Sequence, residues 1–118
     1  MGRSMLGEYL EKYIEGCKTH GSGTDCGDDY RIVNKAYDVL IRNFRVLIKE
    51  EGGKELLKEL LRHDSVYVSA WTATLLIFEY PKECKKVIKS VAKGKGVWAF
   101  SIKTFYNEWK KGNIEKMY

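Results

Sequence analysis

Few side chains in this sequence have the type and spacing that catalysis requires. The two histidines, His20 and His63, stand without a Ser or Cys motif with which a general base would act. The adjacent carboxylates Glu50 and Glu51 fall where a helix is expected to end, so both should be solvated. Residues 94–96 (Gly-Lys-Gly) are too short for a phosphate loop and lack its strand-to-helix context. We therefore expect no catalytic residues and no enzymatic activity.

The cysteines are the next residues with possible chemistry. There are three, and an odd number without an export signal favours reduced thiols over a disulfide framework. Cys17, His20 and Cys26, with Asp25 or Asp28 nearby, contain the ligand types of a zinc site. Their spacing matches no standard finger or knuckle, and an ordinary glycine-rich loop explains the same residues. We expect no metal and no cofactor.

Lysine is very unevenly distributed along the chain. Residues 81–118 hold ten Lys and three Glu, a net charge of +7, whereas residues 1–80 hold 11 basic and 13 acidic residues, a net charge of −2. Such asymmetry predicts an acidic partner, and a merely solvated helix face is the alternative. The candidate partner-binding residues are Lys82, Lys85, Lys86, Lys89, Lys93, Lys95, Lys103, Lys110 and Lys111.

The apolar pattern predicts an all-α fold that positions these lysines. The chain has one Pro, 31% charged residues and runs such as Leu-Leu-Lys-Glu-Leu-Leu over residues 56–61, which favour helix over sheet. No residue between Asp64 and Glu79 is charged, so this segment should be a central helix buried on most sides. With 44% apolar residues the chain can bury one core, and we expect a single helical domain over residues 1–118.

About six helices are expected, separated by turn-forming residues. The first ends at Gly16, and residues 19–27 form a flexible loop because their composition does not hold a helix. Residues 28–29 (Asp-Asp) are placed to begin the second helix, and Pro81 to begin the fifth. The expected helices cover approximately residues 4–15, 28–51, 54–62, 65–80, 81–93 and 97–111.

Short turns predict antiparallel helix pairs stacked side by side. Residues 54–112 contain two such pairs as an imperfect repeat. The pattern resembles HEAT-like repeats, in which a leucine-rich helix is followed by Asp, a gap, Val, a basic residue and an alanine-rich helix. His63-Asp64 and residues 68–76 match it, while Ser69 stands where the family usually has Arg, so its internal Asp-to-Arg ladder is missing. The resemblance implies an α-α superhelix.

A closer resemblance, over residues 30–113, is to a small bacterial family of HEAT-like proteins without assigned chemistry. The matched positions are Tyr37, Leu40, Leu47, Leu57, Leu60, Leu61, His63, Asp64, Val68, Ala70, Trp71, Ala73, Leu75, Gly94, Gly96, Ala99, Trp109 and Gly112. Some small helical proteins of this sort lie beside polymorphic or contact-dependent toxins as immunity partners. The resemblance therefore implies a non-catalytic protein-binding module, most concretely an immunity protein that neutralises a bacterial toxin domain.

Two other functions remain open. The lysines could contact phosphates, which would make the chain a nucleic-acid-binding helical-repeat protein. DNA glycosylases built from helical repeats use a basic concave face with aromatic residues, which Trp71, Trp98 and Trp109 could imitate, but they are about twice as long. Because no apolar leader or spanning segment is found, we expect a cytoplasmic protein with no membrane partner. The sequence does not indicate the oligomeric state.

Overall fold

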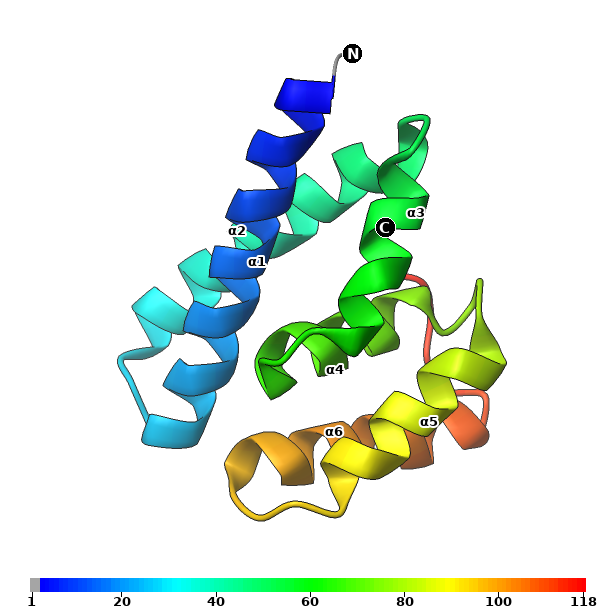
Figure 1. Cartoon of the computed structure of the whole chain (residues 1–118). Helices are drawn as coiled ribbons and strands as arrows, with labels where there is room; N and C mark the ends of the chain where they lie inside the picture. Colours follow the sequence, from blue (N-terminus) through cyan, green and yellow to red (C-terminus); the bar gives the residue numbers. More distant parts are fainter. Residues whose placement is uncertain (1–2) are drawn as a thin grey trace.

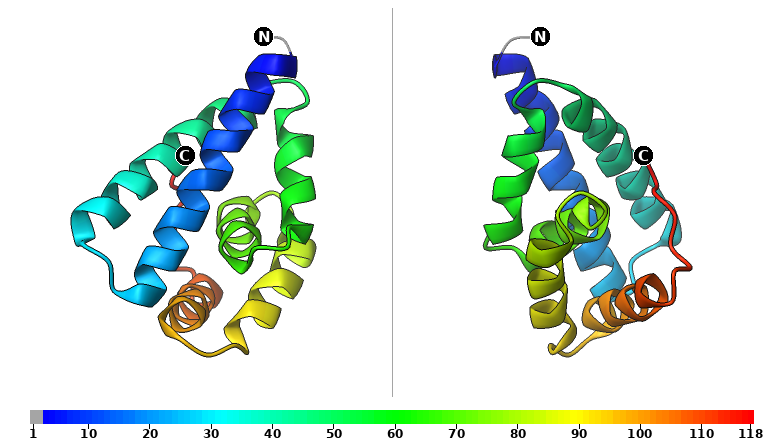
Figure 2. Two further views of the ribbon diagram at one scale, coloured as in Figure 1. Left: turned by 60° about the vertical axis from the view of Figure 1, so that its left-hand side comes forward. Right: turned by 90° about the vertical axis from the view of Figure 1, so that its right-hand side faces the viewer.

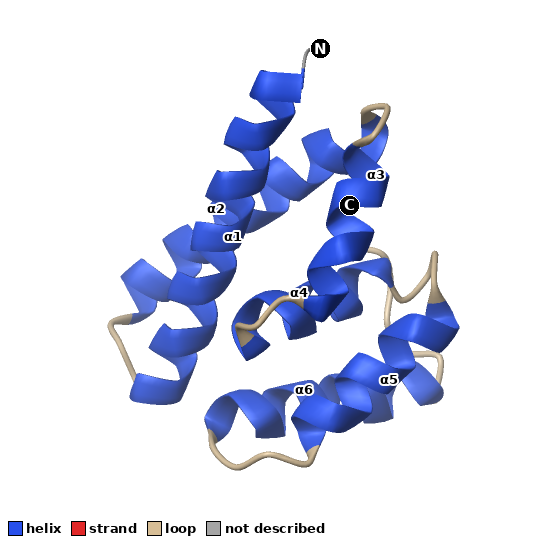
Figure 3. Ribbon diagram, viewed as in Figure 1, coloured by secondary structure: helices blue, strands red, loops and turns tan. Residues whose placement is uncertain are grey.

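Across the part of the chain that the structure describes, the fold consists of six α-helices and one short 3₁₀ turn (Figures 1 and 3). The computed structural model describes residues 3–118, with side chains from residue 5 onward, and contains no strand in that range. No helix there has the length and apolar character needed to cross a membrane. The α-helices are α1 (Arg3–Cys26), α2 (Tyr30–Lys49), α3 (Gly53–Glu59), α4 (Val66–Leu76), α5 (Pro81–Ala92) and α6 (Val97–Lys110), and the 3₁₀ turn η1 is Leu60–Arg62. The expected all-α class with packed helix pairs is confirmed.

Helix α4 lies in the middle of the molecule, as its uncharged sequence predicts. The α1/α2 pair lies to one side of it and the α5/α6 pair to the other (Figures 1 and 2). Every residue from 68 to 77 is buried. The buried threonines of α4 have internal partners: Thr72 donates to the Val68 carbonyl at 2.7 Å, its oxygen lies 3.0 Å from the Tyr13 hydroxyl, and Thr74 donates to the Trp71 carbonyl at 2.8 Å. These hydrogen bonds offset the cost of burying the hydroxyl groups.

The first helix is much longer than the sequence predicts. The expected helix over residues 4–15, ended by Gly16, and the expected flexible loop over residues 19–27 are both wrong, because α1 continues without interruption to Cys26. The chain turns only at Gly27, whose φ of 70° lies in the left-handed region. Residues that read as loop-forming are therefore helical.

Close packing explains why glycine is tolerated inside α1. A Cβ on Gly16 would lie 3.0 Å from the Cβ of Leu40 on α2, and a Cβ on Gly23 would lie 2.9 Å from the Val33 side chain. A Cβ on Gly21 would lie 2.4 Å from the Tyr67 ring on α4. These glycines let α2 and α4 approach the α1 backbone, and the tertiary contacts outweigh the low helix propensity of glycine.

The remaining boundaries differ from expectation by a few residues. The Asp29 carboxylate accepts from the Arg31 amide at 2.8 Å, which caps the start of α2 as predicted, and α2 ends at Lys49. The expected helix over residues 54–62 is split into α3 and η1. Helix α4 ends at Leu76 rather than near residue 80, and turns connect it to α5.

The C-terminal segment returns across the molecule toward α2, which the sequence did not indicate (Figure 2). Arg45 of α2 donates to the Met117 carbonyl at 2.9 Å, and the rings of Tyr118 and Phe44 are 4.7 Å apart. Lys116 forms an ion pair with Glu79 at 3.3 Å. This segment therefore connects α6 to the first helix pair.

The glycine contacts of α1 predict opposite effects at two positions of one helix. Gly21→Ala should lower the free energy of unfolding by about 1–3 kcal/mol, because the new methyl group has no space beside the Tyr67 ring. Gly7→Ala, where nothing lies within 4 Å of the added Cβ, should raise it by roughly 0.5–1 kcal/mol through backbone entropy. Urea denaturation measures both, and equal effects would contradict the close contact.

The burial of α4 predicts a large cost for removing its tryptophan. Trp71 is only 8% exposed and donates through Nε1 to His20 Nδ1 at 3.1 Å. Trp71→Ala should cost about 3–5 kcal/mol of unfolding free energy. Lys89→Ala on the exposed face of α5 should change it by less than about 0.5 kcal/mol. An unchanged melting temperature for the Trp71 variant would show that α4 is not the core helix.

Candidate partner-binding site on the C-terminal helix pair

Helix α5 carries a continuous row of exposed lysines. Cys84 and Ile88 face the core and are fully buried. The lysines at i, i+4, i+7 and i+11 lie on one side of the helix and are exposed. They are Lys82, Lys86, Lys89 and Lys93, hereafter the lysine row. Four of the nine predicted residues therefore share one stripe of a single rigid helix.

Helix α6 places further lysines on its outer side. Trp98, Ala99 and Ile102 face the core, whereas Lys103 and Lys110, two turns apart, are exposed. Of the three remaining predicted residues, Lys85 is on α5, Lys95 lies between the two helices and Lys111 is the C-cap of α6, as Lys93 is the C-cap of α5. The positive charge is thus spread over both members of the pair rather than gathered at one point.

Lys85 links the two helices through aromatic rings. Its Nζ lies 5.2 Å from the ring centre of Trp109 on α6, and Trp109 stacks on Tyr106 with centroids 6.3 Å apart and planes 12° from parallel. The Lys110 Nζ lies 4.7 Å from the ring centre of Tyr106. Cation–π attraction holds both ammonium groups in defined positions. Residues 109 and 110 follow residue 106 by three and four positions, so helical spacing is a sequence signal that could have placed the two rings and Lys110 on one helix face. The pairing of Lys85 with Trp109 could be found only in the structure.

None of the nine predicted lysines forms an ion pair within residues 5–118. The tenth lysine of the C-terminal third, Lys116, is paired with Glu79, which also pairs with Lys54 at 3.1 Å. Hydrogen bonds from Lys54 and then Lys116 hold the pKa of Glu79 below its ordinary value. The structure therefore separates one lysine that has an ion-pair partner from nine that form no ion pair in the described chain.

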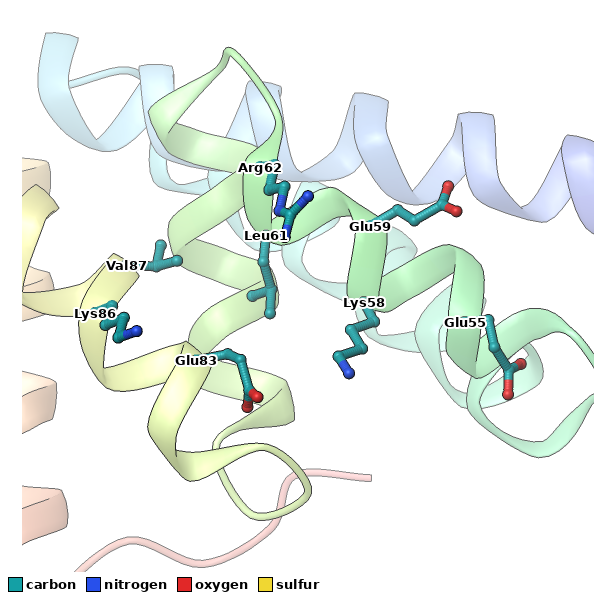
Figure 4. A pocket seen from close by; sticks show the side chains of 8 residues that line it. All are labelled: Glu55, Lys58, Glu59, Leu61, Arg62, Glu83, Lys86 and Val87. Carbon is teal, nitrogen blue, oxygen red and sulfur yellow. The ribbon is translucent and has the colours of Figure 1, made fainter.

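A groove of about 570 Å³ lies beside the lysine row, between α5 and the α3–η1 segment (Figure 4). Lys86 and Glu83 stand on its α5 side, and Val87 and Leu61 supply apolar surface. The remaining lining residues come from α3 and η1: Glu55, Lys58, Glu59 and Arg62. Charges of both signs thus line the groove, and the sequence did not indicate that these acids lie next to the lysines.

Asp25, at the end of α1, fixes the position of α6. One carboxylate oxygen accepts from the Trp98 amide at 2.7 Å, in the first turn of α6, and the other accepts from the Tyr67 hydroxyl at 2.8 Å. A carboxylate at a helix N-terminus is favoured both by the free N–H groups and by the helix dipole. The basic helix pair is therefore anchored to α1 and α4.

His20 lies inside a cluster of aromatic rings and not in a loop. Its ring centre is 5.0 Å from Trp71, 5.9 Å from Trp98 and 6.3 Å from Tyr37. Burial lowers the pKa of His20 below its ordinary value of 6.5, because the charged form is poorly solvated there. Trp71 and Trp98 are thus core residues, while Trp109 lies apart on the surface pair, so the three tryptophans do not form one exposed face.

The cysteines do not gather with His20. Cys17 and Cys26 are separated by about two and a half turns of one continuous helix, so they lie on opposite sides of α1; Cys17 is buried and Cys26 exposed. Among the described residues no three His, Cys, Asp or Glu side chains are grouped to hold a metal ion. Burial raises the pKa of Cys17, and it raises the pKa of Cys84 to about 12, so both buried thiols stay protonated at neutral pH.

Comparison of the chain with protein-family models, curated proteins and solved structures found no match to any of them.

The depressed pKa of His20 predicts a loss of stability in mild acid. Because the folded state holds the neutral imidazole, its contribution is complete above pH 6.5 and is lost as pH falls below 6.5 toward the folded pKa. Protonation also removes the Nδ1 lone pair that accepts from Trp71. Urea denaturation at a series of pH values from neutral to mildly acidic should show this loss in the wild type and a flatter profile in His20→Gln.

Other titrating groups fall outside this window. Arg31 lowers the pKa of Asp29, and Lys54 with Lys116 lowers that of Glu79, so their contributions are lost only below the ordinary values of 3.8 and 4.5. A profile between pH 7 and 5 that is the same in wild type and His20→Gln would contradict the assignment.

Proposed function

We propose that this chain is a non-catalytic protein-binding module, most concretely a cytoplasmic immunity protein that binds and neutralises a bacterial toxin domain through an acidic face of the toxin. The lysine row of α5 carries this proposal: Lys82, Lys86, Lys89 and Lys93 are exposed on one stripe, and no carboxylate pairs with them within the described chain. Such a surface accelerates association with an oppositely charged partner, and an immunity function needs fast capture.

The groove beside the row favours a protein over a nucleic acid. Three carboxylates line it, from Glu55, Glu59 and Glu83, and they balance the three cations of Lys58, Arg62 and Lys86, so the groove offers a phosphate backbone no net attraction. A protein surface can supply charges of both signs and an apolar side chain for Leu61 and Val87. The resemblance to HEAT-like proteins that accompany toxins is consistent with this partner class.

Nucleic-acid binding is the second candidate, and the stacked rings favour it. Tyr106 and Trp109, with Lys85 over the Trp109 ring and Lys110 over the Tyr106 ring, combine aromatic and cationic groups as single-strand binding surfaces do. Lys rather than Arg at these positions favours contact with phosphates over recognition of base edges.

Reversing charges on the row should separate partner binding from folding. We expect the protein to co-purify with the product of the adjacent gene and to rescue growth when that product is toxic. Lys82→Glu combined with Lys89→Glu should weaken this binding by about tenfold or more, mainly through slower association. The matched control, Lys18→Glu with Lys35→Glu on exposed positions of α1 and α2, should bind as the wild type does.

Two results would reject the immunity function. One is a toxic neighbour that is neither bound nor neutralised. The other is micromolar or tighter binding of single-stranded RNA or DNA near physiological salt. If that affinity falls steeply with added salt and is lost in Trp109→Leu, nucleic-acid binding is established instead.

A further inference from the structure

Two apolar side chains stand on the outer side of α6, where a surface helix is expected to be polar. Val97 is 53% exposed and Phe100 is 68% exposed, and they lie one turn apart. The inward positions of the same helix are filled by Trp98, Ala99 and Ile102. Neither Val97 nor Phe100 is therefore needed to cover the core from this helix.

Lysines without acidic partners adjoin this pair. Lys103 follows Phe100 by one turn, and Lys95 precedes Val97 by two residues; both are exposed. The one carboxylate on α6, that of Glu108, accepts from the Asn113 amide at 2.8 Å near the other end of the helix. The apolar pair thus has a basic border and no acidic one on its own helix.

The start of α6 is held rigidly, so the pair is presented in a fixed position. Gly96 adopts a φ of 103°, which glycine tolerates, and Asp25 accepts from the Trp98 amide at 2.7 Å. An apolar group that is ordered before binding loses little conformational entropy when a partner covers it.

We propose that Val97 and Phe100 are the apolar anchor of a docking surface for an acidic protein, one that offers an apolar recess bordered by Asp and Glu. This inference rests on the proposed protein-binding function. It adds the contact that would provide affinity, because an aromatic anchor within a polar border is the usual arrangement of an interface hot spot. Two side chains are too small an apolar surface to hold a protein on a bilayer. Charge complementarity with Lys95 and Lys103 selects the acidic partner.

The test compares two variants that each remove one exposed apolar side chain. Phe100→Ser removes the anchor, and Ile32→Ser removes a side chain on α2 that is 51% exposed and far from the lysine row in sequence. Thermal melts should show both variants folded, since neither side chain is in the core. The probes are the adjacent gene product, a helical peptide of about 20 residues with a leucine stripe bordered by glutamates, polyglutamate, and vesicles containing anionic phospholipid.

We expect Phe100→Ser to weaken binding of the peptide by at least about tenfold and Ile32→Ser to change it by less than about twofold. Polyglutamate, which has no apolar group, should bind both variants as it binds the wild type. Equal peptide affinity in all three proteins, or absence of peptide binding, overturns the inference, as does Phe100-dependent binding to vesicles alone. If the peptide shows the expected dependence while the adjacent gene product does not bind, the immunity function fails and the docking surface stands.

Discussion

The close contact between the glycines of α1 and the neighbouring helices is the constraint on which the rest of the structure depends. At Gly21 the α1 backbone meets the ring of Tyr67 so closely that even a methyl group does not fit. That approach brings Asp25, one turn further along, within hydrogen-bonding distance of both the Tyr67 hydroxyl and the first turn of α6. A single carboxylate therefore joins the N-terminal helix to the central helix and to the C-terminal pair.

Around this junction the core is aromatic, and several of its polar groups have hydrogen-bond partners. Trp71 gives its N–H to His20, Trp98 gives its own to the Val66 carbonyl at 3.3 Å, and Tyr13 meets Thr72. Because an unmet polar group inside a protein is costly, these pairs restrict how the helices can be arranged as well as stabilising them. The returning C-terminal segment closes the same core from the α2 side through Tyr118 and Phe44.

Two parts of the surface differ in their electrostatics. Beside the C-terminal segment, the half-buried Glu79 has the ammonium groups of Lys54 and Lys116 next to it. On α5 and α6 the lysines form no ion pair in the described chain, and Lys85 and Lys110 lie over aromatic rings. Exposed ion pairs contribute little to stability, so the absence of ion pairs for these lysines costs the fold almost nothing. It leaves a positive field that a partner with acidic groups can neutralise, next to the exposed Phe100.

The sequence by itself determined the helical class, the burial of the uncharged run that became α4, the cap at Asp29 and the lysine stripe of α5. Each of these features follows from helical periodicity or from contacts between near neighbours in the chain. The tertiary structure decided the rest. Residues 19–26 are helical only because distant side chains such as Tyr67 pack on their glycines, and local propensity carries no information about that contact. Likewise, the pairing of Lys85 with Trp109, the groove of mixed charge beside Lys86 and the attachment of α6 to Asp25 join residues far apart in sequence, so only the packed fold brings them together.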